Sequence, residues 1–279
     1  MNESRNAGKP LNGKRILVCG KGGSGKSTVV ALMATTLDRM NYETLILDGD
    51  ASNPEGLVPL VFGVNGDQRP KPLIEFFGGV DAVECPVDDP APLQRIDKDK
   101  SAPEAPIDVF EEIPGEYYLR AGNTTLLQAG KINTYGQGCD GPVEKVVRDF
   151  MVKGDSVNII DMKAGIEHFG RRVPDRMNAV LGVLDCSLES VSIANRMDQF
   201  RRDAGINNYW LILNKVESRE TESLMTDQLG DLRDKVIGSI GYDQNVIQWG
   251  LSGTALGDCP ALDGAASIVE RLEQKVSTE

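Results

Sequence analysis

The chain has 279 residues, of which 40% are hydrophobic, and it is therefore long enough to bury a sizeable core in one or two domains. Its 30 Lys and Arg residues are outnumbered by 42 Asp and Glu residues, which gives a net charge of -12 at pH 7. Such an acidic surface repels phosphate backbones and anionic lipid, so we expect neither nucleic acid nor a membrane among its partners.

The apolar pattern and the cysteines predict a cytoplasmic chain. Residues 1–15 contain no apolar stretch of signal-peptide length, and eighteen apolar residues never occur in succession. The five cysteines are scattered and odd in number, which favours reduced thiols over a disulfide framework. We expect residues 1–14 to be a flexible N-terminus and residues 15–279 to form a single domain.

The predicted elements alternate along the chain. Short apolar runs rich in β-branched residues predict buried strands at residues 15–19, 44–48, 157–161, 179–185, 209–215 and 235–240. Helix-length segments lie between several of them, at residues 26–40, 190–205 and 220–235, and a closing amphipathic helix is expected at residues 265–279. This alternation predicts an α/β fold, a doubly wound, mostly parallel sheet with helices on both faces.

Two segments depart from this rhythm. Residues 84–106 are rich in Pro and Asp and have no apolar period, so they are either a surface insertion or a mobile lid. Residues 117–123 are a candidate edge strand.

Polar and small residues follow the predicted strands where each strand ends. They are Gly-Lys-Gly-Gly at 20–23, Asp-Gly-Asp at 48–50, Asp-Met-Lys-Ala-Gly at 161–165, Asp-Cys-Ser at 185–187 and Asn-Lys at 214–215. In open α/β sheets, ligands bind at the carboxyl ends of the strands. Loops are polar in general, but they do not usually begin so consistently with Asp or Asn. The sequence therefore predicts a binding site at this edge of the sheet.

Residues 20–28, GKGGSGKST, follow a predicted strand, open a predicted helix and fit the phosphate-loop pattern. The glycines of such a loop let backbone N–H groups turn toward the phosphates, and the helix N-terminus adds the positive end of its dipole. Lys26 is expected to reach the β- and γ-phosphates of ATP, and the Ser27 hydroxyl to bind Mg²⁺. The residues expected to contact the nucleotide here are Gly22, Gly23, Ser24, Gly25, Lys26, Ser27 and Thr28.

Lys21 is one lysine more than a phosphate loop needs. With it, the loop resembles the deviant Walker A loop of the family that contains nitrogenase iron protein, MinD, ParA and the nickel-insertion ATPases, which are P-loop NTPases of the SIMIBI class. The resemblance implies an ATP-bound homodimer in which Lys21 crosses the two-fold interface and touches the phosphates of the partner subunit. A cation supplied in this way stabilises transition-state charge only after two subunits close. The alternative is an exposed lysine without a role.

The same resemblance assigns the acidic strand ends. It implies that Asp50, in a first switch at residues 48–57, orients the attacking water, and that Asp48 supports the Mg²⁺ shell through water. Asp161 heads a second switch at residues 161–172 and is expected to hold the Mg²⁺ water shell. Each aspartate alone could equally be a helix cap or a turn residue.

A base-recognition pair is implied at the end of another strand. Asn214 and Lys215 resemble the Asn-Lys pair of the family, whose amide suits the adenine edge. Residues 238–243 are similar to the loop that closes over the base, although Gly241 stands where proline is common.

Within the family, the chain resembles the CooC-type ATPases, which help to insert nickel into carbon monoxide dehydrogenase. The resemblance rests on residues 48–57, 130–142, 164–172, 185–194 and 213–216. It implies a maturation factor for a client metalloenzyme, with ATP and Mg²⁺ as cofactors and Ni²⁺ or Zn²⁺ at the dimer interface.

The metal motif of that branch is incomplete here. The family has a Cys-x-Cys pair in the Gly-rich segment, whereas this chain has Cys139 followed by Asp140. Two thiolates across a dimer are too few for a four-sulfur site. Cys139 is therefore either a transition-metal ligand, completed by Asp140 or His168, or an ordinary loop cysteine. Cys85 and Cys259 have no partner at ligand spacing.

Three other functions stay open at this point. A paralogue without metal would regulate a partner protein, and a MinD- or ParA-like ATPase would position cargo on a membrane or DNA. An electron-donating reductase would need two interface cysteines per subunit, for which Cys139 and Cys186 are the candidates. The acidic charge balance speaks against the positioning function.

Overall fold

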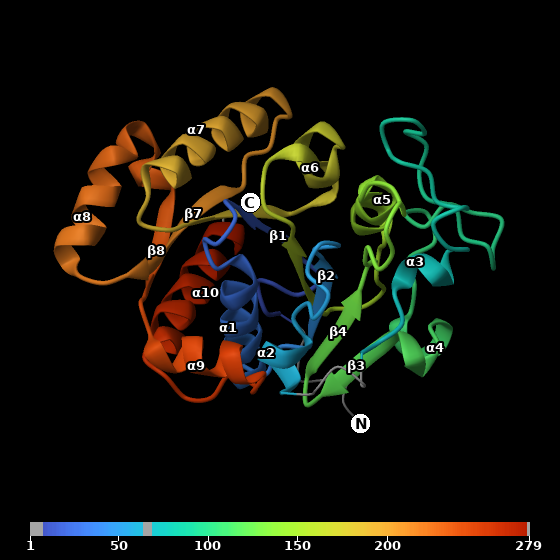
Figure 1. Cartoon of the computed structure of the whole chain (residues 1–279), viewed down its shortest axis with the longest axis horizontal. Helices are drawn as coiled ribbons and strands as arrows, with labels where there is room; N and C mark the ends of the chain where they lie inside the picture. Colours follow the sequence, from blue (N-terminus) through green and yellow to red (C-terminus); the bar gives the residue numbers. More distant parts are fainter. Residues whose placement is uncertain (1–7, 64–68, 278–279) are drawn as a thin grey trace.

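The structure is a computed structural model that describes residues 8–63 and 69–277. Its described residues form one eight-stranded sheet with the strand order β3-β4-β2-β5-β1-β6-β7-β8 (Figure 1). All neighbouring strands are parallel except β3 and β4, which pair antiparallel at one edge. The strands are β1 Arg15–Gly20, β2 Thr44–Gly49, β3 Tyr118–Ala121, β4 Thr124–Gln128, β5 Val157–Met162, β6 Ala179–Leu184, β7 Tyr209–Val216 and β8 Val236–Gly241.

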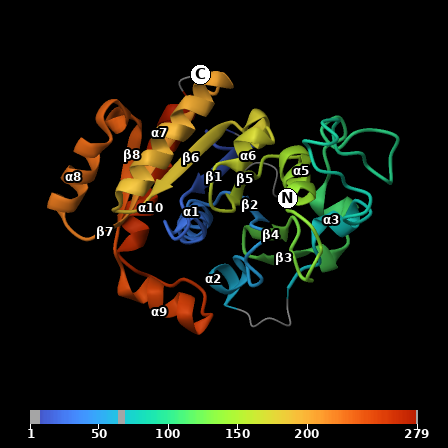
Figure 2. The ribbon, with the colours of Figure 1, turned by 45° about the horizontal axis from the view of Figure 1, so that its top comes forward.

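Helices cover both faces of this sheet (Figure 2). One face packs against α1 (Lys26–Arg39) and α10 (Ala261–Ser277), and the other against α5 (Gly141–Asp149), α7 (Leu188–Asp203) and α8 (Arg219–Gln228). The remaining helices are α2 Val58–Phe62, α3 Leu73–Phe76, α4 Val109–Glu112, α6 Glu167–Gly170 and α9 Gln244–Ser252, with 3₁₀ turns η2 Gly115–Tyr117, η3 Val173–Arg176 and η4 Gly230–Lys235. No helix in the described part of the chain combines the length and apolarity that crossing a membrane requires.

The core lies in two layers because successive strand residues point to opposite faces. Ile16 and Val18 of β1 pack into the layer under α1 and α10, whereas Leu17 and Cys19 pack into the layer under α5 and α7. All four side chains are fully buried. The predicted doubly wound α/β fold is therefore confirmed.

The predicted strands are all present, but three details differ from the sequence prediction. The candidate edge strand is β3, and β4, which follows it directly, was not predicted. The segment 220–235 is not one helix, because α8 ends before Gly230, whose φ of 53° is left-handed, and the chain continues as η4. Helices α2 to α6 and α9 were not predicted either.

The Pro- and Asp-rich segment 84–106 lies on the surface beside α5, drawn in turquoise in Figures 1 and 2. It contains no helix or strand, but it is bonded to α5: the Leu93 backbone N–H donates to Asp149 Oδ2 at 2.8 Å, and Lys145 pairs with Asp89. Leu93 itself is buried.

The N-terminal segment falls partly outside the described residues, which begin at residue 8. Within residues 8–14, Leu11 is fully buried in the layer under α1 and α10. The packed part of the chain therefore begins before residue 15.

Candidate nucleotide-binding site

The loop between β1 and α1 has the conformation that a phosphate cradle needs. Gly25 caps α1 with a φ of 89°, a left-handed conformation that glycine adopts without strain. A Cβ at this position would lie 2.3 Å from Asn214 Nδ2, so only glycine fits. Lys26 is buried, and its Nζ donates across the loop to the Lys21 carbonyl at 3.1 Å. The loop thus presents backbone N–H groups and one ammonium group around the N-terminus of α1.

The end of β7 braces this loop from the side. Asn214 Nδ2 donates to the Ser24 carbonyl at 2.8 Å, and Lys215 Nζ donates to the Gly23 carbonyl at 2.7 Å. Both residues also line the neighbouring cavity. The pair predicted to recognise the base therefore also holds the phosphate loop in place.

Ser27 and Asp161 meet at the predicted Mg²⁺ position. Ser27 Oγ donates to Asp161 Oδ2 at 2.6 Å, while the buried Asp161 Oδ1 has no hydrogen-bond partner among the described residues. Burial, together with the charges of Asp48 and Asp50, raises the pKa of Asp161 to about 7, although Ser27 and Lys26 oppose the shift. A hydroxyl beside an under-coordinated carboxylate is the oxygen donor set that Mg²⁺ prefers, so these residues fit the ion.

Asp48 is committed to contacts with the first switch and with Lys131. Its carboxylate is fully buried; Oδ2 pairs with Lys131 Nζ at 2.8 Å, and Oδ1 accepts the Asp50 backbone N–H at 3.1 Å. Burial raises the pKa of Asp48 in spite of Lys131. Lys131 Nζ also donates to the Asp50 carbonyl at 2.7 Å. The pair therefore fixes the chain that carries Asp50.

Sequence reasoning missed Lys131. It belongs to no phosphate-loop or switch motif, and the available signal was its place in the Gly-rich segment 130–142. Asp50 itself is half-buried and accepts from the backbone N–H and hydroxyl of Ser52, at 2.9 and 2.6 Å. These two bonds orient its carboxylate.

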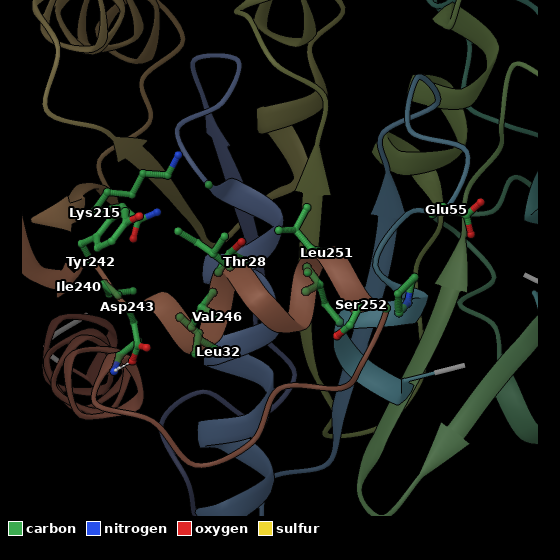
Figure 3. Close-up of a pocket in the computed structure, with 18 of the residues that line it drawn as sticks. Thr28, Leu32, Glu55, Lys215, Ile240, Tyr242, Asp243, Val246, Leu251 and Ser252 are labelled. Atoms are coloured by element: carbon green, nitrogen blue, oxygen red, sulfur yellow. Dashed lines mark hydrogen bonds between the residues drawn. The ribbon is translucent and has the colours of Figure 1, made fainter. Parts of the chain in front are cut away.

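A cavity of about 650 Å³ opens beside the phosphate loop, a size typical of ligand pockets (Figure 3). Thr28 and Leu32 of α1 form its floor, Lys215 and Tyr242 lie together on one side, and Glu55 lies on the opposite side. The predicted base-closing loop forms part of the wall, to which it contributes Ile240, Gly241, Tyr242 and Asp243. Helix α9, which contributes Val246, Ile247, Gly250, Leu251 and Ser252, forms the wall that was not predicted.

Lys21 is held by its own subunit. Its Nζ lies 3.0 Å from Asp185 Oδ2 and 3.6 Å from Glu189 Oε2, and it donates to Ser187 Oγ at 3.1 Å. The hydrogen bond with Asp185 raises the pKa of Lys21. Burial would raise the pKa of Asp185, but hydrogen bonds from Ser187, Ser190 and Lys21 lower it. The Lys21 ammonium group thus points to the turn between β6 and α7. Its crossing to a partner subunit stays a prediction.

The ligands considered for Cys139 are not available to it. Both Asp140 oxygens are in ion pairs, with Arg171 at 3.1 Å and with Lys163. His168 is fully buried, which lowers its pKa to about 3, and neither ring nitrogen has a hydrogen-bond partner among the described residues. The described residues contain no group of three or more His, Cys, Asp or Glu residues placed to hold a metal.

Cys19 and Cys186 lie in different surroundings. Cys19 lies in the core, where burial raises its pKa to about 12. Cys186 is exposed, and its Sγ lies 3.6 Å from the Lys215 carbonyl, at the side of the phosphate loop.

Comparisons with known proteins agree with this geometry. The family model described as CbiA, the CobQ/CobB/MinD/ParA nucleotide binding domain, matches residues 16–256. An uncharacterized ATP-binding protein of Methanocaldococcus jannaschii is 31% identical over 252 residues, 87% of this chain and 93% of the relative. The carbon monoxide dehydrogenase accessory protein CooC of Rhodospirillum rubrum is 27% identical over 237 residues, 83% and 85% of the two chains.

Among solved structures, the septum site-determining protein MinD of Pyrococcus horikoshii, complexed with Mg-ADP, has the same fold. Its TM-score is 0.62 at 17% identity, and the match covers 92% of this chain and 94% of that one. The family match spans the phosphate loop, both switches and all but one of the residues that line the cavity. The chain therefore belongs to the CobQ/CobB/MinD/ParA family of nucleotide-binding domains and is one of its ATPases.

Proposed function

We propose that the chain is an ATP-driven dimerisation switch that serves as a maturation factor for a metalloenzyme, in the way its CooC relative is an accessory protein of carbon monoxide dehydrogenase. ATP and Mg²⁺ bind at the phosphate loop, Ser27 and Asp161. Asp50 orients the attacking water, and Lys21 of each subunit reaches the triphosphate of the other. Nickel is the metal that the relative's client suggests. The similarity to CooC over 83% of this chain supports the client class.

The observation that carries the proposal is an ion-pair cluster between the second switch and the cysteine loop. Lys163, two residues after Asp161, pairs with Asp140, the neighbour of Cys139. Arg171, at the end of the switch, pairs with Asp140 at 3.1 Å and with Glu144 of α5 at 2.5 Å. A movement of the switch on hydrolysis therefore pulls directly on the segment that carries Cys139.

The Lys21 step is supported by the partners of this side chain in the isolated subunit. A lysine shared among Asp185, Ser187 and Glu189 is available for exchange, because its ion pairs are part-exposed, with side-chain exposure of 16% for Lys21 and 18% for Asp185. Contact with a triphosphate, which carries more charge, outcompetes them.

The test compares oligomeric size with ADP and with a non-hydrolysable ATP analogue, by light scattering after size exclusion. We expect monomer with ADP and dimer with the analogue. Lys21→Ala should bind nucleotide but lower kcat by about 10³-fold, the range for a charge supplied in trans. Lys14→Ala, at the opposite end of β1, is the matched control. A Lys21→Ala protein that turns over at the wild-type rate as a monomer refutes the dimer mechanism.

The client class needs a separate measurement. Nickel and zinc contents of the purified protein are compared in both nucleotide states, with sedimentation on anionic liposomes and DNA as parallel arms. We expect metal in one state only and no sedimentation. If the protein contains no metal and sediments with liposomes or DNA in ATP, the maturation function is wrong and a positioning function takes its place. If it contains no metal and does not sediment, regulation of a partner protein takes its place.

A further inference from the structure

Two cysteines that are 54 positions apart in the sequence meet beside the N-terminus of α5. A Cβ built at Gly141 would lie 2.4 Å from Cys85 Sγ and 3.4 Å from Cys139 Sγ, so both sulfur atoms lie within 3.4 Å of one point. Cys85 is half-buried and Cys139 is exposed, and neither is in a disulfide. Cys85 comes from the segment 84–106, which the sequence predicts to be either a surface insertion or a mobile lid.

The two thiols line a cavity separate from the nucleotide cavity. It has a volume of about 330 Å³, and its walls include Asp81, Asp88, Lys131 and Gln137. Gln137 closes the loop that carries Cys139: its Oε1 accepts the Asn133 N–H at 2.7 Å, and its Nε2 donates to the Lys131 carbonyl at 3.1 Å. The cavity is therefore a formed feature of this loop and is open to solvent at Cys139.

We propose that Cys85 and Cys139 of one subunit are the two thiolate ligands of a site for a soft, thiophilic metal ion. Thiolate sulfur selects soft ions such as Cu(I). The site holds its ion with two sulfur ligands, because the described residues supply no third His, Cys, Asp or Glu ligand. Two-coordinate Cu(I) needs only these two, whereas structural Zn²⁺ needs four.

The start of α5 shapes the place that the Cys85 sulfur occupies. Cys85 Sγ lies against Gly141, the first residue of α5, where the helix dipole stabilises negative charge. The absence of a side chain at Gly141 makes the room that the Cys85 sulfur occupies.

The first switch contacts a wall of this cavity, and the second contacts a residue next to the wall. Lys131 lines it and pairs with Asp48 of the first switch, and Asp140, next to Cys139, pairs with Lys163 and Arg171 of the second. The nucleotide state therefore has two direct connections to the geometry of the thiol pair. The use of this coupling for metal delivery rests on the proposed function, whereas metal binding by the pair does not.

The test titrates the reduced, nucleotide-free protein with Cu(I) buffered by bicinchoninate. We expect one Cu(I) per chain for wild type and at least a tenfold weaker competition with the chelator for Cys85→Ser and for Cys139→Ser. Cys259→Ser and Cys186→Ser are the matched controls and should bind as wild type does. Because Cys139 is exposed, its replacement by serine leaves the fold intact, which a urea titration verifies.

A second variant tests the geometry without removing a thiol. A methyl group in Gly141→Ala would lie 2.8 Å from Cys85 Cβ as well as 2.4 Å from its sulfur, so Cys85 must move and Cu(I) binding should weaken. Cys85→Ser binding Cu(I) as tightly as wild type overturns the proposal, and so does equal loss in the Cys259→Ser control. Because no nucleotide is present, this result is independent of the dimerisation assay, and either proposal can fail alone.

Discussion

The single histidine of the chain makes one pH effect separable from all others. His168 lies in the second switch, fully buried against the ring of Phe169 at 4.9 Å. Burial, followed by the positive charges of Lys163, Lys26 and Arg171, lowers its pKa from 6.5 to about 3. The unfolded chain therefore binds a proton between these two pH values that the folded chain does not bind.

The sign and size of the effect follow from linkage. The stability contributed by a neutral His168 is fully present above pH 6.5 and is lost as the pH falls from 6.5 toward 3. At pH 5.0, which is about 1.5 units below the pKa in the unfolded chain, the loss is about 2 kcal/mol at 1.36 kcal/mol per unit. This figure depends on the unfolded-chain pKa and hardly on the folded value, because the folded pKa lies well below 5.

His168→Leu removes the titration and fills a similar volume. We expect wild type to lose about 2 kcal/mol more than the variant in urea unfolding between pH 7.5 and 5.0. At pH 7.5 the variant should be as stable as wild type or more stable, because neither ring nitrogen has a partner among the described residues and such a group costs about 1–3 kcal/mol. Asp161, whose pKa is raised to about 7, titrates in both proteins and cancels from the difference.

His168→Gln is the control for polarity, since it keeps a polar side chain but does not titrate. Its stability should depend on pH in the same way as that of the leucine variant. Identical pH dependence in wild type and His168→Leu would refute the buried, neutral imidazole, as would a proton NMR titration of the His168 ring with a midpoint near 6.5.

Three further substitutions probe the nucleotide site. Lys131→Met leaves the Asp48 carboxylate buried and unpaired, so we expect a loss of about 3–5 kcal/mol in urea unfolding, and a loss below 1 kcal/mol would contradict the buried pair. Asp50→Asn should retain ATP binding by fluorescence titration and lower kcat by about 10²–10⁴-fold, and an unchanged kcat would remove Asp50 from the reaction. Gly25→Ala places a methyl group 2.3 Å from Asn214 Nδ2 at a left-handed φ, so calorimetry should detect no ATP binding while the far-UV spectrum stays native, whereas wild-type affinity would contradict the close approach.

The strands could be predicted because the sheet is covered on both faces. β1, β2, β5 and β6 are near-continuous apolar runs for that reason. β4 escaped prediction because it begins with two threonines and follows the edge strand after a turn of only two residues, although every residue in it is buried.

Helix α5 escaped prediction for a different reason. It carries Glu144, Lys145, Arg148 and Asp149, which suggest an exposed surface, yet all four are buried. Glu144 pairs with the second switch and Lys145 with the segment 84–106. Arg148 and Asp149 pair with each other and also bond to Ala91 and Leu93 of that segment. The partners outside the helix are not visible in a sequence window. Charge pairing over long sequence separations hides a buried helix from any periodicity argument.

Some residues of the candidate site could be predicted from local motifs, and others could not. The phosphate loop, Asp161 and Asn214 lie where their local motifs place them, because each motif sits at the end of one strand. Lys131 and Cys85 could not be found, since each depends on a contact made across 50 residues or more. Tertiary contact, rather than spacing, defines these two residues.

The ion pair between Lys21 and Asp185 also limits when Lys21 can contact a second chain. Since the Lys21 ammonium group already pairs with Asp185 in its own chain, contact with a neighbouring chain that holds no triphosphate would not be more favourable. Under the proposed dimer mechanism, subunits without ATP that collide in solution therefore separate again. Ionic strength, by weakening the internal ion pair, would then set how readily the side chain is released.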